Sequence, residues 1–217
     1  MSHQVPEDAS LELLIDYCSG ARAAAMAADL PEVAASLGTF RTELKASRDA
    51  RDAAREYTLE TSAVVRVRDT NWDAVVTGVS GAAFLAAGKK PDQDPYQLLF
   101  GTVKADEATG LGPEKAYAFG DTLLTRARAQ NHAAVVPLLP GVVAANDALK
   151  AAGDARAAAS LAELPHEVER RKRVAALERV IAVAEVAILT KHPGRADLVR
   201  AVLAWPRAPK RKKTTQE

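Results

Sequence analysis

Several residue types on which functional sites depend are scarce in this chain of 217 residues. Its one cysteine, Cys18, excludes an intramolecular disulfide bond and a metal site built from several cysteines. The four histidines are far apart in sequence, so no metal-binding spacing is visible among them. The formal net charge is +1, which gives no overall field that would attract nucleic acid or a membrane surface.

Long apolar segments are also missing. The longest uncharged runs, residues 74–88 and 132–146, have 15 residues each, whereas a membrane-spanning helix needs about 20. The first ten residues lack the basic-then-apolar order of a signal peptide. We therefore expect a soluble, cytoplasmic protein without a membrane span.

Alanine is abundant, whereas aromatic residues make up only 5% of the chain. Alanine has the highest helix propensity but adds little buried area, so an alanine-rich core requires closely packed helices. The predicted fold is an all-α, Ala-rich antiparallel bundle of about six helices plus short ones. We assign residues 1–204 to one helical-bundle domain and residues 205–217 to a disordered basic tail.

Capping residues and prolines predict where the helices of the first half begin and end. A first helix spans residues 7–30, with Ser10 placed to cap it, and Pro31 suits the first turn of the next helix. From Pro31 to residue 89 no further proline occurs, and 59 helical residues would measure about 89 Å, too long for one compact domain. We therefore expect a break at residues 61–62 or 69–71.

The second half is divided in the same way. Residues 101–112 are the most loop-like part of the chain, and Pro137 and Pro140 indicate another connection. We expect an interruption at Gly153 and a new helix start at Pro165. The helices expected here span residues 113–131, 141–164, 165–191 and 195–203, and a short one spans 96–100 before them.

Landmarks of the first half return in the second half in the same order. The pairs and their offsets are Leu30-Pro31 with Leu139-Pro140 (109), Asp49-Ala50-Arg51 with Asp154-Ala155-Arg156 (105), and Lys90-Pro91 with His192-Pro193 (102). Slowly shrinking offsets indicate a duplication followed by small deletions, although Ala-rich helices also match one another by chance. The copies would be residues 30–101 and 139–204, each a helical hairpin followed by a short helix.

Ala74, Gly78, Ala82 and Ala86 form a row of small residues at four-residue steps. Such a row allows a neighbouring helix to approach closely. We therefore expect this face to be covered by another helix.

Glu163 and His166 have the Glu-x-x-His spacing with which di-iron helical bundles place two metal ligands. Such sites need a second pair on a facing helix, and the first copy has no matching Glu-x-x-His. Pro165 also places the two residues across an expected helix start. They are the metal candidates of the chain, and a polar turn between helices is the simpler interpretation.

Other chemistry-bearing residues are isolated. Asp69 and Asp73 flank Trp72 and could form a carboxylate pair in a groove, with one pKa raised by the other; a solvated helix face is the simpler interpretation. Cys18 falls on the apolar side of its helix, where a buried, unreactive thiol is expected. No catalytic constellation or phosphate-binding glycine motif is visible, so we predict no enzymatic activity and no cofactor.

The tail, residues 205–217, carries five cations and one anion, Glu217. The cations, which are the candidate nucleic-acid contacts, are Arg207, Lys210, Arg211, Lys212 and Lys213. They could neutralise phosphates in a weak, salt-sensitive way, or only keep the chain soluble. Residues 170–173 form a second basic cluster, which nearby glutamates offset.

These observations favour a non-enzymatic protein that acts in protein–protein interaction or scaffolding, with a protein partner or as a homodimer. One alternative is a nucleic-acid-associated accessory protein that uses the basic tail. Another is a helical-bundle metalloprotein built around Glu163 and His166.

Overall fold

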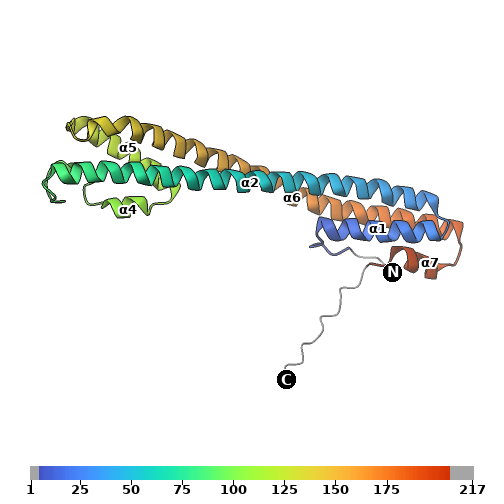
Figure 1. Cartoon of the computed structure of the whole chain (residues 1–217). Helices are drawn as coiled ribbons and strands as arrows, with labels where there is room; N and C mark the ends of the chain where they lie inside the picture. Colours follow the sequence, from blue (N-terminus) through green and yellow to red (C-terminus); the bar gives the residue numbers. More distant parts are fainter. Residues whose placement is uncertain (1–4, 206–217) are drawn as a thin grey trace, which may run out of the picture. The chain divides into compact units, whose positions relative to one another are not determined.

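The computed structural model describes residues 5–205, and helices form all the regular secondary structure in that range (Figure 1). The helices are α1 (Leu11–Ala27), α2 (Pro31–Ala86), α3 (Tyr96–Phe100), α4 (Ala105–Thr109), α5 (Pro113–Gln130), the 3-10 helix η1 (Val136–Leu138), α6 (Leu139–Lys191) and α7 (Ala196–Leu203). The all-α class expected from the composition is confirmed. No helix of residues 5–205 is long and apolar enough to cross a membrane.

Local capping signals identify several helix ends correctly, although α1 is shorter than the expected residues 7–30. The Ser10 hydroxyl accepts a hydrogen bond from the backbone N–H of Leu13 over 3.2 Å and caps α1. Pro31 opens α2, and Pro113 occupies the first turn of α5. Asn131 ends α5 in the left-handed conformation, with φ 47° and ψ 39°, which asparagine tolerates well.

The predicted helix breaks are wrong. Helix α2 continues for 56 residues through positions 61–62 and 69–71, and α6 continues for 53 residues through Gly153 and Pro165. Hydroxyl groups at the expected breaks do not cap new helices. They donate hydrogen bonds to backbone carbonyls four residues earlier in α2, Thr61 to that of Tyr57 and Thr70 to that of Arg66.

Pro165 lies inside α6 without ending it. A proline removes the hydrogen bond to the carbonyl four residues earlier, here that of Leu161. Both Pro165 and Leu161 are exposed, so water can bind that carbonyl in place of the missing N–H. The loss of one hydrogen bond is therefore tolerated.

The segment 101–112, expected to be the most loop-like, contains the short helix α4. Two smaller expectations need correction. The connection marked by prolines is shorter than expected, because α6 already begins at Leu139. The row of small residues at 74–86 is not covered by a helix: a Cβ added at Gly78 would meet no atom within 4 Å.

The chain forms two compact units, and α2 and α6 each contribute one part to both of them. Unit 1 comprises Met1–Ala53 and Glu163–Glu217, and unit 2 comprises Ala54–Ala162. This division gives each part of the 56-residue helix α2 its own core, so a helix longer than one compact domain can form. The assignment of residues 1–204 to a single domain stays a prediction.

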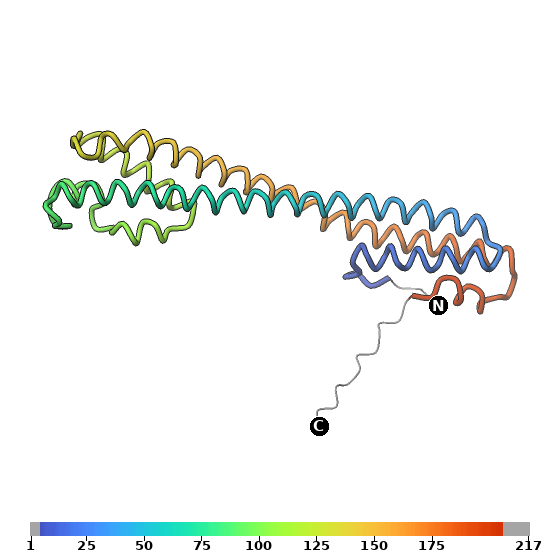
Figure 2. Tube along the Cα trace, viewed as in Figure 1, coloured from blue at the N-terminus to red at the C-terminus, as the bar shows by residue number. Residues whose placement is uncertain are grey.

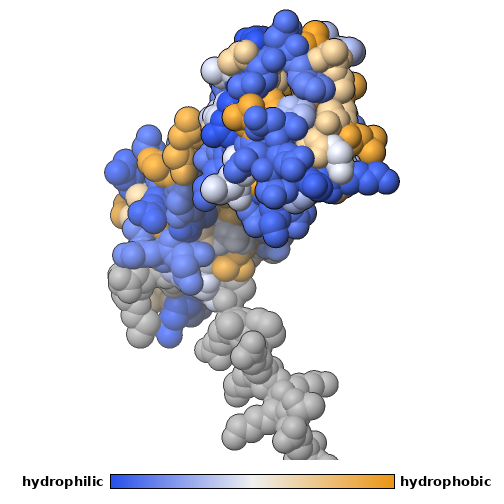
Figure 3. Space-filling view, turned by 90° about the vertical axis from the view of Figure 1, so that its left-hand side faces the viewer, coloured by the Kyte–Doolittle hydropathy of each residue, from blue (hydrophilic) through white to orange (hydrophobic). Residues whose placement is uncertain are grey.

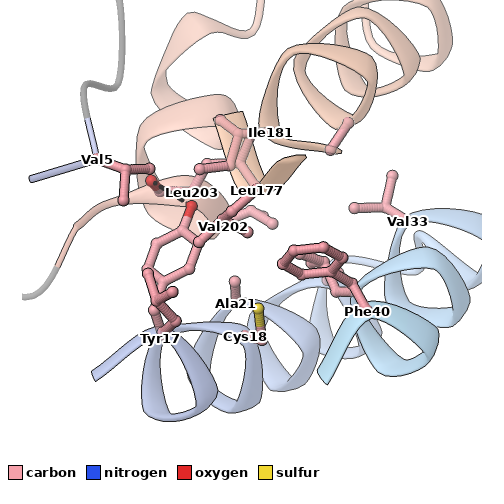
Figure 4. Packing of buried hydrophobic residues seen from close by; sticks show 14 of the residues in the cluster. Val5, Tyr17, Cys18, Ala21, Val33, Phe40, Leu177, Ile181, Val202 and Leu203 are labelled. Atoms are coloured by element: carbon pink, nitrogen blue, oxygen red, sulfur yellow. Dashed lines mark hydrogen bonds between the residues drawn. The ribbon is translucent and has the colours of Figure 1, made fainter. Parts of the chain in front are cut away.

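In unit 1, α1 and α7 pack against the first part of α2 and the last part of α6, which lie side by side although distant in sequence (Figure 2). Leucine, valine and isoleucine side chains from all four segments fill the core (Figure 4). The Tyr17 hydroxyl donates a hydrogen bond to the carbonyl of Leu203 over 3.1 Å, and the Tyr17 ring stacks on Trp205 with centroids 4.6 Å apart. These contacts hold the end of α7 against α1.

In unit 2, α3, α4 and α5 pack with the last part of α2 and the first part of α6. Its core contains more aromatic rings than that of unit 1. Phe100 stacks on Tyr96 with centroids 5.0 Å apart, and Trp72 meets Phe119 edge-on at 6.3 Å. Unit 2 also contains the one buried polar cluster described next.

Candidate functional site

Asn146 lies in the core of unit 2, where only 3% of its surface is exposed. Its Oδ1 accepts a hydrogen bond from Nε1 of Trp72 over 3.1 Å, and its Nδ2 donates to Oδ1 of Asp121 over 2.7 Å. Both ends of the amide are therefore satisfied despite burial. Gly120 faces the same amide, and a Cβ at that position would collide with Asn146 Oδ1. These contacts link α2, α5 and α6 and fix how the three helices are aligned along one another.

Sequence reasoning missed Asn146. The signal was its position in the seam Val142, Asn146, Leu149, where a polar residue takes a core place at steps of four and three. A buried asparagine in such a seam fixes the pairing of helices at some cost in stability.

Asp69 takes a similar core place on α2, between the buried residues Val65 and Trp72. Its Oδ1 is buried without a hydrogen-bond partner among the described residues, and burial raises the pKa of this carboxyl above its usual 3.8. Burial, followed by the charge of Asp69, raises the pKa of Asp73 as well. The two carboxylates therefore lie on a half-buried face of α2, close enough to affect each other.

The metal candidates, Glu163 and His166, lie within the continuous helix α6, not across a helix start. His166 lines a shallow groove in which Glu169 is the one acidic side chain and most of the other lining residues, such as Ala46 and Val168, offer no ligands. Within residues 5–205 no group of three or more His, Cys, Asp and Glu side chains is placed to hold a metal ion. The arrangement supplies at most two ligands of a site.

The five cations of the basic tail lie outside the described residues. The second basic cluster, residues 170–173, is described and is largely engaged in unit 1. Arg170 binds the Glu167 carboxylate at 2.8 Å and the carbonyls of Glu7 and Ala9, and Arg173 binds Glu43 at 2.6 Å. These arginines hold unit 1 together and leave little free charge for phosphates.

Cys18 is buried in the core of unit 1, as its position on the apolar side of α1 predicted (Figure 4). Burial raises the pKa of its thiol to about 12. A thiol with so high a pKa carries almost no thiolate at neutral pH and is a poor nucleophile.

Large apolar side chains are exposed on α6 in unit 1. Val183 is 68% exposed, Val186 65% and Leu189 36%, and exposed Ala182 lies beside them. We call these four residues the outer stripe. Other large apolar side chains are exposed as well, among them Leu161, Leu164 and Val168 on α6. On the face in Figure 3 polar residues dominate, with apolar residues between them.

The outer stripe could have been found in the sequence. Residues 180–189 read VIAVAEVAIL, with Glu185 as the only charge, so the helix is apolar on nearly every side. Only a helix over residues 165–191 was expected here, and no distinction between its faces was predicted.

A search of protein-family models, of curated proteins and of solved structures finds no match to this chain.

Proposed function

We propose that this protein is a non-enzymatic interaction or scaffold protein, and that the outer stripe of α6 is where it binds a helix of a partner chain. The observation that carries the proposal is that α6 is apolar on two faces while unit 1 covers one of them. Leu177, Ile181 and Ile188 are buried in unit 1, whereas Val183 and Val186 face away from it and are exposed. A helix that is apolar all round is normally buried on all sides.

The spacing of the outer face favours a helical partner. Ala175, Arg179, Ala182, Val186 and Leu189 follow one another at steps of four and three, the repeat of a coiled-coil seam. The alanines permit close approach, and the two larger side chains at the end of the row can enter the holes of a facing helix. Arg179 interrupts the seam, so the apolar contact is restricted to the last two turns of α6.

Exposed apolar groups that gather on one helix face mark interaction sites more often than scattered ones do. The outer stripe combines the two most exposed valines of the described chain with a leucine one turn further on. A cytoplasmic location belongs to the same proposal, because the single, buried cysteine suits a reducing compartment.

The direct test is to capture partners with the full chain and with Val183→Glu/Val186→Glu. Both positions are exposed and glutamate has a better helix propensity than valine, so this variant keeps its fold. The matched control is Leu85→Glu, which places a charge at a residue 65% exposed on α2 in unit 2. The proposal predicts that a stoichiometric partner, or a second copy, is lost with the double variant and kept with the control. A monomer that captures nothing contradicts it.

We also infer that the chain arose by duplication, and that the copies extend beyond residues 30–101 and 139–204 to include α1 and α5. The buried positions of the two halves correspond at offsets of 102 to 109, the range that the sequence landmarks span. The corresponding pairs are Leu14 and Ala116, Cys18 and Gly120, and Ala25 and Ala127 (102); Val33 and Val142, and Phe40 and Leu149 (109); Trp72 and Leu177, Val76 and Ile181, Val79 and Ala184, and Ala83 and Ile188 (105); and Leu99 and Val202, and Phe100 and Leu203 (103).

The change from an offset of 109 to 105 removes four residues from the second long helix. Four residues are about one helical turn of 3.6, so the buried face is kept. Each unit then combines the early part of one copy with the late part of the other. This is the arrangement expected if the two identical chains of a segment-swapped dimer became joined in one chain.

A further inference from the structure

A hollow with a volume of about 490 Å³ lies in unit 1 between α1 and the first part of α2. A smaller hollow of about 220 Å³ shares three of its lining residues, Arg22, Met26 and Arg41. We call the two hollows together the arginine groove. Among the described residues that line it, none is an aspartate or a glutamate. Pockets that hold small molecules typically measure about 300–1,000 Å³, so the groove is large enough for one.

Local contacts hold both arginines at the groove. Arg41 Nε donates a hydrogen bond to the Ser19 hydroxyl over 2.6 Å, and that hydroxyl donates to the carbonyl of Ile15 over 2.8 Å. Arg22 lies against Gly38 of α2, where an added Cβ would meet its Cδ and Nε at 3.5 Å. In the described part of the chain, the outer guanidinium nitrogens of Arg41 donate no hydrogen bond. These nitrogens are therefore free to bind a ligand.

The charges of Arg22 and Arg41 are not balanced by carboxylates. Within residues 5–205, neither arginine forms an ion pair, whereas six other arginines of unit 1 bind a carboxylate at 2.6–3.2 Å: Arg48, Arg51, Arg170, Arg171, Arg173 and Arg195. Two positive charges beside one hollow repel each other, and an anion bound between them relieves that repulsion. The groove therefore selects for negative charge.

This pair of arginines is specific to unit 1. The positions that correspond in unit 2, at the offsets of 102 and 109, carry Asp121 for Ser19, Leu124 for Arg22 and Lys150 for Arg41. Unit 2 thus has one charge of each sign where unit 1 has two positive charges and a hydroxyl. The shared architecture of the two units does not require the arginines.

We propose that the arginine groove binds the phosphate group of a small organic phosphate monoester, with Arg22 and Arg41 donating hydrogen bonds to its oxygens. Such a phosphate carries nearly two negative charges at neutral pH, which two guanidinium groups balance. Met26, which is 60% exposed, and Pro31 offer an apolar surface for the organic part. The inference does not depend on the proposed docking surface, since the groove is built by α1 and α2 and the outer stripe by α6.

The test is a calorimetric or NMR titration of the full chain with phenyl phosphate, inorganic phosphate and benzoate. Salt of about 0.15 M screens weak attraction to scattered surface charges. The variants Arg22→Gln and Arg41→Gln each remove one cation of the groove. The matched control, Arg179→Gln, removes an exposed cation of α6 in unit 1. Glutamine and arginine have similar helix propensities, so all three variants keep their fold.

A further variant, Ser19→Asp, tests the groove without removing an arginine. It gives Arg41 a carboxylate partner within the chain, as unit 2 carries Asp121 at the corresponding position. This internal carboxylate competes with a bound phosphate for the Arg41 guanidinium.

The proposal predicts saturable binding of phenyl phosphate, weakened about tenfold or more by Arg22→Gln, Arg41→Gln and Ser19→Asp because charge-assisted hydrogen bonds are lost. Arg179→Gln leaves binding unchanged. Benzoate, with one charge, and inorganic phosphate, without an apolar part, bind more weakly. The proposal is overturned if the native chain shows no saturable binding of phenyl phosphate, or if any of the three groove variants binds it as the native chain does. It is also overturned if Arg179→Gln weakens binding equally, or if benzoate or inorganic phosphate binds as tightly as phenyl phosphate.

Discussion

The indole N–H of Trp72 donates a hydrogen bond to Oδ1 of Asn146 over 3.1 Å in the core of unit 2, although 74 positions separate the two residues. In unit 1 the corresponding residues, Leu177 and Leu37, are both apolar and fully buried. At corresponding positions, the core of unit 2 therefore contains a polar, hydrogen-bonded pair, whereas the core of unit 1 is wholly apolar. A segment of one unit placed in the other would leave the indole or the amide without its partner, which makes wrong pairing of the segments costly.

Gly120→Ala is predicted to destabilise the protein by about 1–3 kcal/mol, because the new methyl group would collide with Asn146 Oδ1. The same substitution in an Asn146→Ala background should cost little, since the colliding atom is gone. Denaturant unfolding of the single and double variants measures this coupling. The control is Gly153→Ala, which has open space and should gain up to about 1 kcal/mol. Equal costs of Gly120→Ala in both backgrounds would show that Asn146 is not the obstacle.

The position of unit 1 that corresponds to Asp69 is occupied by Val174. The substitution Asp69→Val should therefore be accommodated, and it should stabilise the protein by about 1 kcal/mol at neutral pH. The pKa of Asp69 is raised in the folded state, so folding favours its protonated form. Its contribution to stability is complete below the unfolded pKa and is lost as pH rises through the folded pKa. The advantage of the valine variant should therefore shrink as the pH falls toward 4. If the difference in unfolding free energy between the variant and the native chain stayed constant or grew as the pH fell, it would contradict a buried carboxylate at position 69.

The basic tail offers a direct test of the nucleic-acid alternative. The full chain and a chain ending at Pro206, which lacks all five tail cations, are compared for binding to a labelled duplex and a single strand. If the tail contacts phosphates, only the full chain binds, and its affinity falls steeply between 50 and 200 mM salt. Because the arginines of residues 170–173 are engaged within unit 1, the shortened chain should show no residual binding. Equal binding by both chains would exclude the tail as the contact.

The sequence predicts helix ends well where the deciding atoms are local. Ser10, Pro31, Pro113 and Asn131 each act on a backbone group within a few residues, so their effect can be read without tertiary structure. The breaks were predicted wrongly because they depend on packing. Nothing in the residues around Pro165 shows that both helices would continue into a second unit.

The faces of the long helices were harder to predict than their existence. Val64 and Val67 follow a helical spacing but are exposed, whereas Val65, one position from Val64, is buried. When apolar residues lie on several sides of a helix, the sequence alone does not determine which side is buried. For the same reason Asn146 and the outer stripe were not found in the sequence, and a solvated face was favoured for Asp69, whose Oδ1 is buried.

The measurement that tests the central claim most directly is photo-crosslinking in cell extract, with a benzophenone amino acid placed either at Val186 or at Leu85. Both residues are apolar and 65% exposed, so the two probes differ in their position on the protein and are matched in exposure and polarity. The account predicts one adduct of defined mass from position 186, formed with a partner chain or a second copy, and none from position 85. No adduct at 186, or the same adducts from both positions, would contradict a docking surface on α6.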